Sequence, residues 1–203
     1  MPFQVGRVRG GQRLIANSGS ASMGYDLPAA IGAAFARSGQ RVICLSGDGS
    51  IQFNLQELQT IVHHSLPVKL FVLNNGGYRS IRSTQMHFFG QPMGESTGTG
   101  ISFPNLSSIA GAYGIRYGSI VSGRDLDSID RMLSSEGPVL CEVVSDPNQS
   151  YEPRLKSREL PDGTLVSPAL EDMYPYLSAE ELAENMEPSV AVGRTDAVHQ
   201  GSR

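Results

Sequence analysis

Four short runs that are rich in β-branched or apolar residues lack the polar alternation of a strand that has one face in water. These runs are Val42–Ser46, Val68–Leu73, Ile115–Val121 and Val139–Val144. Runs of this length and composition are typical of parallel strands that are covered on both faces. The pattern therefore predicts four buried strands in an open parallel sheet.

Helical patterns lie between these strands. Leu27–Ser38 is rich in alanine, and Asp26 is its expected N-cap. In Asn54–His64 the apolar positions share one helical face behind Asn54, the expected N-cap, and Asp125–Ser134 repeats this pattern. Strands that alternate with helices are typical of right-handed crossovers in a parallel sheet. We therefore expect an α/β fold of three layers, α/β/α.

The pattern changes towards the carboxyl end of the chain. Residues 145–167 hold prolines, glycines and charges without a clear period, and a short acidic helix is expected at Ala179–Met186. Residues 188–203 have the composition of a flexible tail. We therefore predict one domain over residues 1–187, followed by this tail.

Composition narrows the classes of function. The 203 residues carry 16 Lys and Arg against 20 Asp and Glu, so the net charge of −4 offers no basic surface for nucleic acid or an anionic membrane. No apolar run approaches the roughly 20 residues of a membrane span, and the amino terminus lacks a signal peptide's apolar region. Cys44 and Cys141 lie in apolar runs and are expected to be reduced core thiols. We predict a cytoplasmic protein.

Polar clusters directly follow two of the predicted strands. Ser46–Ser50 reads Ser-Gly-Asp-Gly-Ser, and Asn74–Tyr78 reads Asn-Asn-Gly-Gly-Tyr. Each cluster alone is an ordinary turn, but the carboxyl ends of parallel strands meet where ligands bind. A carboxylate and an amide oxygen are hard ligands for magnesium, which usually also binds substrate phosphates, and N–H groups after Asp48 can hold the same phosphates.

These clusters resemble a known family signature. Gly47-Asp48-Gly49, followed after 24 residues by Asn74-Asn75, is similar to the GDG…NN signature of thiamine diphosphate-dependent enzymes. The upstream segment 20–33 (SASMGYDLPAAIGA) and the segments 52–60 and 78–85 resemble acetolactate synthase-like members. The resemblance covers about residues 10–175. It implies the thiamine diphosphate-binding fold, specifically the domain that holds the diphosphate.

The resemblance also implies residue roles. Asp48 and Asn75 would bind Mg²⁺ through their side chains, and Gly77 through its backbone carbonyl. Alanine replaces a frequent glycine at Ala21, and it can still hold the cofactor's amino group where its φ is negative. The residues implied to contact thiamine diphosphate are Ala21, Ser22, Met23, Gly47, Asp48, Gly49, Ser50, Asn75, Gly77 and Tyr78.

Three residues are implied to act in catalysis. Met23 takes the place of the bulky residue that bends the cofactor, so that its two rings meet. Ile81 and Arg82 would face the substrate, where Arg82 either binds a substrate carboxylate or is simply solvated. Both interpretations of Arg82 stay open.

The resemblance implies that parts of the family's machinery lie outside this chain. The resemblance implies a pyrimidine-binding domain with a glutamate, and an opening strand that precedes Met1, so the sheet is expected to be incomplete at its N-terminal edge. Either a second subunit supplies these parts in an α₂β₂ hetero-oligomer, or the chain is a fragment. The partner would cover the face of residues 27–35 and the loop Met86–Met93.

The implied activity is that of a lyase or transferase. It would decarboxylate a 2-oxo acid, with pyruvate as the first candidate, and join the resulting enamine to a second carbonyl. The alternatives are a non-oxidative 2-oxo acid decarboxylase subunit and a non-catalytic regulatory subunit that keeps the fold. A dinucleotide-dependent oxidoreductase is disfavoured, because the Gly47–Gly49 turn is not the G-x-G-x-x-G motif.

Overall fold

The computed structural model describes residues 8–149 and 152–186, which belong to two compact units divided at residues 149 and 150. The two units are described separately. The predicted flexible tail, residues 188–203, lies outside the described residues. The predicted domain boundary at residue 187 stays a prediction.

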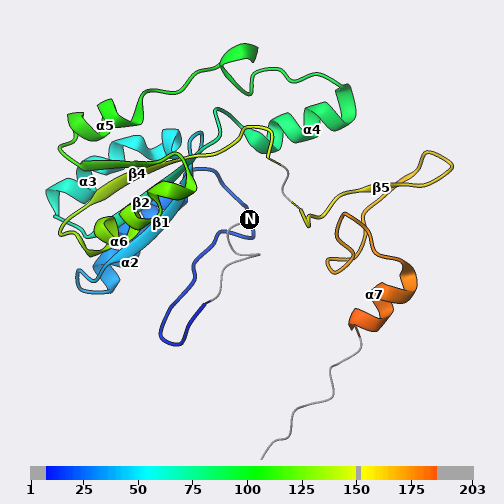
Figure 1. The fold of residues 1–203 in the computed structure, drawn as a ribbon, viewed down its shortest axis with the longest axis horizontal. Coiled ribbons are helices and arrows are strands. Elements are labelled where there is room, and N and C mark those ends of the chain that lie inside the picture. Colours follow the sequence, from blue (N-terminus) through cyan, green and yellow to red (C-terminus); the bar gives the residue numbers. More distant parts are fainter. Residues whose placement is uncertain (1–7, 150–151, 187–203) are drawn as a thin grey trace, which may run out of the picture. The chain divides into compact units, whose positions relative to one another are not determined.

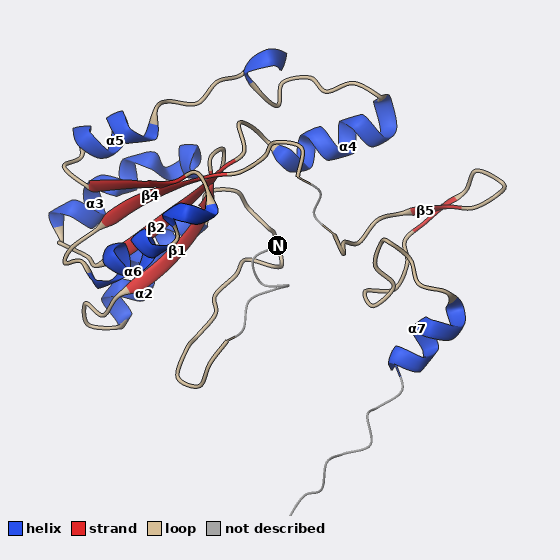
Figure 2. Ribbon diagram, viewed as in Figure 1, coloured by secondary structure: helices blue, strands red, loops and turns tan. Residues whose placement is uncertain are grey.

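The first unit is built on a parallel sheet, as predicted. Its strands are β1 (Val42–Gly47), β2 (Val68–Asn74), β3 (Arg116–Ile120) and β4 (Val139–Val144), and their order is β1-β2-β4-β3 (Figures 1 and 2). Every neighbouring pair is parallel. The strands were therefore located from the sequence to within about two residues at each end, and the α/β fold is confirmed.

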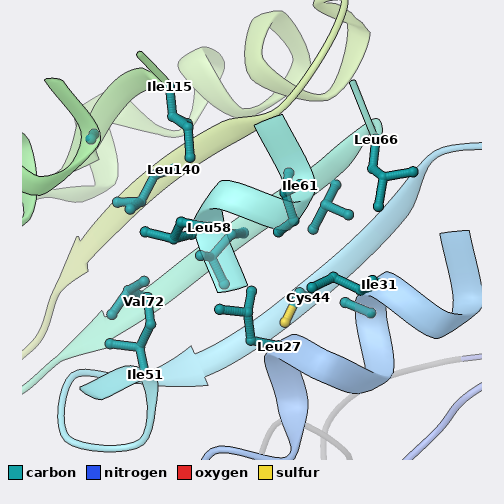
Figure 3. Packing of buried hydrophobic residues seen from close by; sticks show 14 of the residues in the cluster. Leu27, Ile31, Cys44, Ile51, Leu58, Ile61, Leu66, Val72, Ile115 and Leu140 are labelled. Carbon is teal, nitrogen blue, oxygen red and sulfur yellow. The ribbon is translucent and has the colours of Figure 1, made fainter. Parts of the chain in front are cut away.

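Helices cover both faces of the sheet. One core cluster joins α2 (Asp26–Ala36), the 3₁₀ helix η1 (Ile51–Glu57), α3 (Leu58–His63) and α5 (Leu106–Ala112) to one face of β1, β2 and β4 (Figure 3). The other cluster places Met132 of α6 (Asp127–Ser134) against the opposite face, on Phe71 and Cys141. Because Leu140 and Cys141 enter different clusters, β4 is buried on both faces.

Both edge strands depart from the predicted burial: in β3 only Ile120 is buried, and β1 is buried on one face alone. Cys44 and Ser46 are buried, whereas Ile43 is 52% and Leu45 41% exposed on the other face. The cluster under α6 includes no residue of β1. Within the described residues β1 pairs only with β2, so its outer edge is the edge at which we expected an incomplete sheet.

Both predicted N-caps are wrong. Tyr25 is the N-cap of α2, and Asp26 instead accepts hydrogen bonds from the Ser50 hydroxyl at 3.2 Å and from the Leu27 N–H at 3.0 Å. Asn54 lies inside η1 with a non-helical backbone, and its side-chain amide donates to the carbonyl of Gly24 at 2.7 Å. Tertiary hydrogen bonds have therefore replaced the expected local ones.

Two helices were not predicted. One is α5, and the other is α4 (Arg79–Phe89), whose last four residues occupy the first half of the expected loop Met86–Met93. None of the residues of α4 is buried, so the helix shows no apolar stripe directed at the core. Two short 3₁₀ turns, η2 (Thr97–Thr99) and η3 (Gly123–Asp125), complete the unit.

A lysine lies inside the sheet. The side chain of Lys69 on β2 is fully buried, and its ammonium group donates to the carbonyls of Ser135 and Gly137, each at 2.6 Å, at the end of α6. Burial lowers the pKa of Lys69, and the charges of Arg116 and Arg41 add to that effect. With the Ser135 hydroxyl at 3.3 Å, these carbonyls give the ammonium three bonded groups, without which it could not leave water.

The second unit is small and contains the predicted acidic helix. It holds an antiparallel pair, β5 (Arg158–Glu159) and β6 (Leu165–Val166), and helix α7 (Ala179–Met186). Arg158 forms an ion pair with Asp172 at 3.3 Å and lies over the ring of Tyr176. In neither described stretch is a helix both long and apolar enough to span a membrane.

Candidate functional site

Asp48 is the centre of the candidate site. It follows β1 directly, and it is only 4% exposed. One carboxylate oxygen accepts the N–H of Gly49 at 2.8 Å, and the other accepts the N–H groups of Asn75 at 3.1 Å and Gly77 at 3.0 Å. Because Gly47 lies opposite Leu73 in the parallel register, the two polar clusters meet as predicted.

The environment of Asp48 disfavours its charge. Burial raises the pKa of this carboxyl, and the N–H groups of Gly77, Gly49, Asn75 and Gly76 only partly oppose that effect. In the described part of the chain Asp48 has no ion-pair partner. A buried carboxylate of this kind would gain most from a bound cation.

Asn75 provides a second oxygen beside Asp48. Its side-chain oxygen is buried and has no hydrogen-bond partner. The neighbouring Asn74 differs, because its amide bonds to Glu142 and to the N–H of Gly76. Leaving a buried polar oxygen unpaired costs roughly 1–3 kcal/mol, so few such atoms occur without a reason. The Asn75 oxygen is therefore free to bind a ligand.

These donors fit magnesium. A carboxylate, an amide oxygen and a backbone carbonyl of Gly77 form a small set of hard oxygens, which suits an ion that keeps waters and binds phosphate. Across residues 8–149 and 152–186 no group of three or more His, Cys, Asp or Glu could hold a metal ion. A zinc-type centre therefore has no support in that part of the chain.

Two positions of the site need glycine, because neighbouring atoms approach the backbone too closely for a side chain. A Cβ on Gly49 would lie 2.3 Å from the Tyr78 ring, and one on Gly77 would lie 2.1 Å from the carbonyl oxygen of Glu95. The Tyr78 ring also packs edge-on against Phe103, with centroids 5.4 Å apart. The backbone at these two positions is therefore packed too tightly for any side chain.

Hydrogen bonds of Ser50 connect the segment around Met23 to the candidate site. Its hydroxyl oxygen accepts the N–H of Gly24 at 2.9 Å, next to Met23 in the chain, and it donates to Asp26. Met23 itself is 45% exposed, and Ala21 and Ser22 are exposed as well. The φ of Ala21 is +50°, not negative as the sequence interpretation required. The cofactor contacts of these three residues stay predictions.

Ile81 and Arg82 begin α4, directly after the second cluster. Ile81 is exposed, whereas the Arg82 guanidinium forms an ion pair with Glu95 at 2.6 Å and donates to the carbonyl of Pro147 at 2.8 Å. The interpretation of Arg82 as solvated is therefore wrong. Its contact with a substrate carboxylate stays a prediction, which competes with these bonds.

Glu95 is a site residue that the sequence interpretation missed. Burial tends to raise its pKa, but hydrogen bonds from Ser96 and Arg82, the charge of Arg82 and the Thr99 hydroxyl together hold the pKa below its ordinary value. The available signal was a single charge inside the glycine-, serine- and threonine-rich segment 94–100. That signal does not identify the ion-pair partner, Arg82, which lies 13 residues earlier.

Comparisons with known proteins agree with this geometry. The family described as "Thiamine pyrophosphate enzyme, C-terminal TPP binding domain" matches residues 2–143. The acetolactate synthase large subunit of Cyanidium caldarium is 37% identical over 142 residues, which are 70% of this chain and 24% of that protein. The acetolactate synthase isozyme 2 large subunit of Escherichia coli is 36% identical over 144 residues, 70% of this chain and 26% of that protein.

A solved structure is also similar. The thiamine diphosphate-dependent 4-hydroxybenzoylformate decarboxylase of Rhodococcus jostii RHA1 superposes with a TM-score of 0.56 at 30% identity, over 64% of this chain and 24% of that one. This chain belongs to the thiamine pyrophosphate enzyme family and carries the cofactor-binding domain of acetolactate synthase-like members. It spans about a quarter of the length of these relatives.

Proposed function

We propose that this chain is the magnesium- and diphosphate-binding part of an acetolactate synthase-like enzyme that acts with a second polypeptide. The observation that carries the proposal is the unpartnered, buried side-chain oxygen of Asn75 beside the buried carboxylate of Asp48. A scaffold without a ligand has no use for two such oxygens at one sheet edge.

Each part of the site has a role in this proposal. Asp48 and Asn75 hold Mg²⁺ with the Gly77 carbonyl, while Gly47, Gly49, Ser50 and Tyr78 surround the diphosphate. Ser22 and Met23 bind the other end of thiamine diphosphate, where Met23 sets its bend; Ala21, with a φ of +50°, lacks the negative φ that its expected contact required. Bound there, thiamine diphosphate supplies the carbon nucleophile that attacks a 2-oxo acid and stores the electrons left by carbon dioxide.

The chain's own residues shape the pocket around that chemistry. Ile81 is exposed at the start of α4, and Phe88 and Phe89 are exposed at its end. In the assembled enzyme these apolar side chains exclude water from the reacting carbons, which favours attack on a second carbonyl over simple protonation. The same residues therefore favour a carboligase, with pyruvate as the first donor to be tested.

The partner in this proposal carries the pyrimidine-binding domain and the glutamate that acts on the pyrimidine ring. The exposed apolar side chains of the first unit include Met23, Tyr25 and Phe35, before or on α2, and Met86, Phe88 and Phe89 on α4. We propose that the partner covers both in a hetero-oligomer, with α₂β₂ as the simplest form. The cytoplasmic location stays a prediction.

A decarboxylase without ligation is the second candidate. It is favoured by the likeness to the solved structure of the 4-hydroxybenzoylformate decarboxylase. The two candidates share the cofactor site and differ only in the fate of the remaining carbon unit. Analysis of products therefore separates them.

Calorimetric titration with thiamine diphosphate tests the proposed site. The chain, combined with its partner polypeptide, is titrated with and without Mg²⁺. We expect binding that requires Mg²⁺ and disappears with EDTA. Equal affinity with and without the ion would contradict the proposal.

A further inference from the structure

An ion pair between Arg82 and Glu95 lies next to the loop that carries Asn75 and Gly77, which is called the magnesium loop below. Nε of Arg82 and Oε2 of Glu95 are 2.6 Å apart, and the two side chains are only 13% and 3% exposed. Arg82 belongs to the first turn of α4, where its N–H donates to the carbonyl of Tyr78 at 2.9 Å. Arg82 therefore stands four residues after Tyr78, and the pair that it forms with Glu95 is almost removed from water.

The groups of this pair are also bonded to their surroundings. The Ser96 hydroxyl donates to Oε1 of Glu95 at 2.7 Å, and the Thr99 hydroxyl lies 3.4 Å from the same oxygen. Arg82 donates through Nη1 to the carbonyl of Pro147, beyond β4. The pair thus joins the start of α4, the turn at 95–99 and the segment after β4. A buried pair with such satisfied groups fixes the segments that it joins.

The backbone of Glu95 contacts the magnesium loop itself. The carbonyl oxygen of Glu95 accepts the N–H of Tyr78 at 2.8 Å, and Gly77 forms an antiparallel bridge with Ser96. A Cβ on Gly77 would meet this carbonyl oxygen at 2.1 Å and Nη2 of Arg82 at 2.8 Å. On the other side, the Gly77 N–H donates to Asp48 at 3.0 Å. Gly77 is therefore enclosed between Asp48 and the Arg82–Glu95 pair.

Contacts of this kind are needed because the backbone of the magnesium loop is otherwise free to change conformation. Gly76 and Gly77 are consecutive glycines, which have the greatest backbone freedom of all residues. A carbonyl ligand is useful only if its direction is fixed before the ion binds, because ordering the backbone at that moment would weaken binding. Contacts from outside the loop must therefore hold Gly77.

We propose that Arg82 and Glu95 are positioning residues that hold the Gly76–Gly77 turn in the orientation needed to bind magnesium and diphosphate. This inference rests on the proposed function for its ligand, but the ordering of the turn is a property of the chain alone. In this inference Arg82 acts by orienting Gly77, and not by contacting the substrate.

The first test is hydrogen exchange on the chain without any ligand. Glu95→Gln removes the charge, and Arg82→Lys keeps the charge but loses the geometry of the guanidinium. We expect the amides of Gly77 and Tyr78 to exchange at least tenfold faster in both variants, while amides of β2 and β4 keep their protection. The control is Glu136→Gln, an exposed residue before β4. Unchanged exchange at Gly77 and Tyr78 in a folded variant would overturn the inference. If Glu95→Gln fails to fold, the milder Arg82→Lys decides.

The second test is the Mg²⁺-dependent affinity for thiamine diphosphate, measured by calorimetry with the partner polypeptide present. Groups that orient metal ligands typically contribute about 10–100-fold in affinity, so both variants should bind about 10-fold more weakly or worse. A purely structural pair would lower the melting temperature without changing this affinity. Wild-type affinity in both variants would therefore overturn the inference. If the wild type itself shows no Mg²⁺-dependent binding, the proposed function fails, and hydrogen exchange still decides whether the pair orders the turn.

Discussion

Asp48 and Gly77, 29 residues apart, are joined by a hydrogen bond of 3.0 Å from the Gly77 N–H to the Asp48 carboxylate. This bond ties the end of β1 to the loop that follows β2. The carboxylate also accepts the N–H of Asn75, so three proposed magnesium ligands share one hydrogen-bonded group. The site is therefore assembled by the backbone before any ion is present, which lowers the entropy lost on binding.

Asp48→Asn tests the metal site. The variant keeps the size of the side chain and removes its charge, so Mg²⁺-dependent affinity for thiamine diphosphate should fall by about 100-fold or more, beyond the effect expected for groups that only orient a ligand. Calorimetry with the partner present measures this change, and circular dichroism checks the fold. An affinity within a factor of three of the wild type would exclude Asp48 as a ligand.

Gly77→Ala tests the close approach behind the site. The added methyl would lie 2.1 Å from the carbonyl oxygen of Glu95, so backbone must move. We expect a loss of about 3 kcal/mol in the free energy of unfolding, at the upper end for overpacking. Urea denaturation measures it.

Gly32→Ala is the matched control for that variant. Gly32 lies inside α2, and a Cβ there meets nothing within 4 Å. Alanine should therefore stabilise the chain by about 1 kcal/mol through helix propensity. Equal effects of the two substitutions would show that crowding at Gly77 is not the cause.

The two cysteines should resist alkylation in the folded protein. Burial raises the pKa of the Cys44 thiol to about 12, helped by the charge of Asp26, and burial with the charge of Glu142 raises that of Cys141 to about 11. The reactive thiolate is therefore scarce below pH 11. The rate with iodoacetamide, followed by mass spectrometry, should rise with pH without a plateau between pH 8 and 10.

The same shifts fix the sign of a stability effect. Between the ordinary thiol pKa of 9.0 and the raised values, the folded state holds protons that the unfolded state has lost. Stability must therefore fall as pH rises through this window. Rapid alkylation at pH 8 in the native protein would contradict the burial of both thiols.

Product analysis separates carboligation from simple decarboxylation. We expect the chain with its partner, thiamine diphosphate and Mg²⁺ to release carbon dioxide from pyruvate and to form a branched 2-hydroxy-ketone product. Mass spectrometry with ¹³C-labelled pyruvate identifies whether the labelled carbons join a second carbonyl. Free aldehyde as the main product would favour the decarboxylase. Release of no carbon dioxide from common 2-oxo acids would contradict both.

The strands and the centre of the site could be predicted because their signals are local. Each strand lies in a run rich in β-branched or apolar residues, and the polar clusters stand directly at the ends of two such runs. The parallel arrangement alone then brings Asp48 to Asn75. Helix α4 was not predicted in this way: its apolar residues Ile81, Met86, Phe88 and Phe89 lie mostly at its end, and none of its residues is buried against the core.

Tertiary bonds explain the other differences. Asn54 and Asp26 are residue types that are favoured at N-caps. In the structure Asn54 instead bonds to Gly24, and Asp26 bonds to Ser50, each from a distant segment. Lys69 stands in a run that predicts a buried strand, and its burial depends on carbonyls of residues 135 and 137. The ion pair of Glu95 likewise depends on how α4 packs. None of these partners can be identified from spacing along the chain.

The uncovered edge of β1 has a consequence for the behaviour of the protein in concentrated solution. In the described residues its outer N–H and C=O groups meet no other strand, and Ile43 and Leu45 present apolar side chains beside them. Such an edge is a template on which a strand from another molecule can add, and natural proteins usually protect it with charge. The chain produced by itself should therefore form growing aggregates as its concentration rises. A single lysine in place of Leu45 should keep it dispersed, as light scattering can measure.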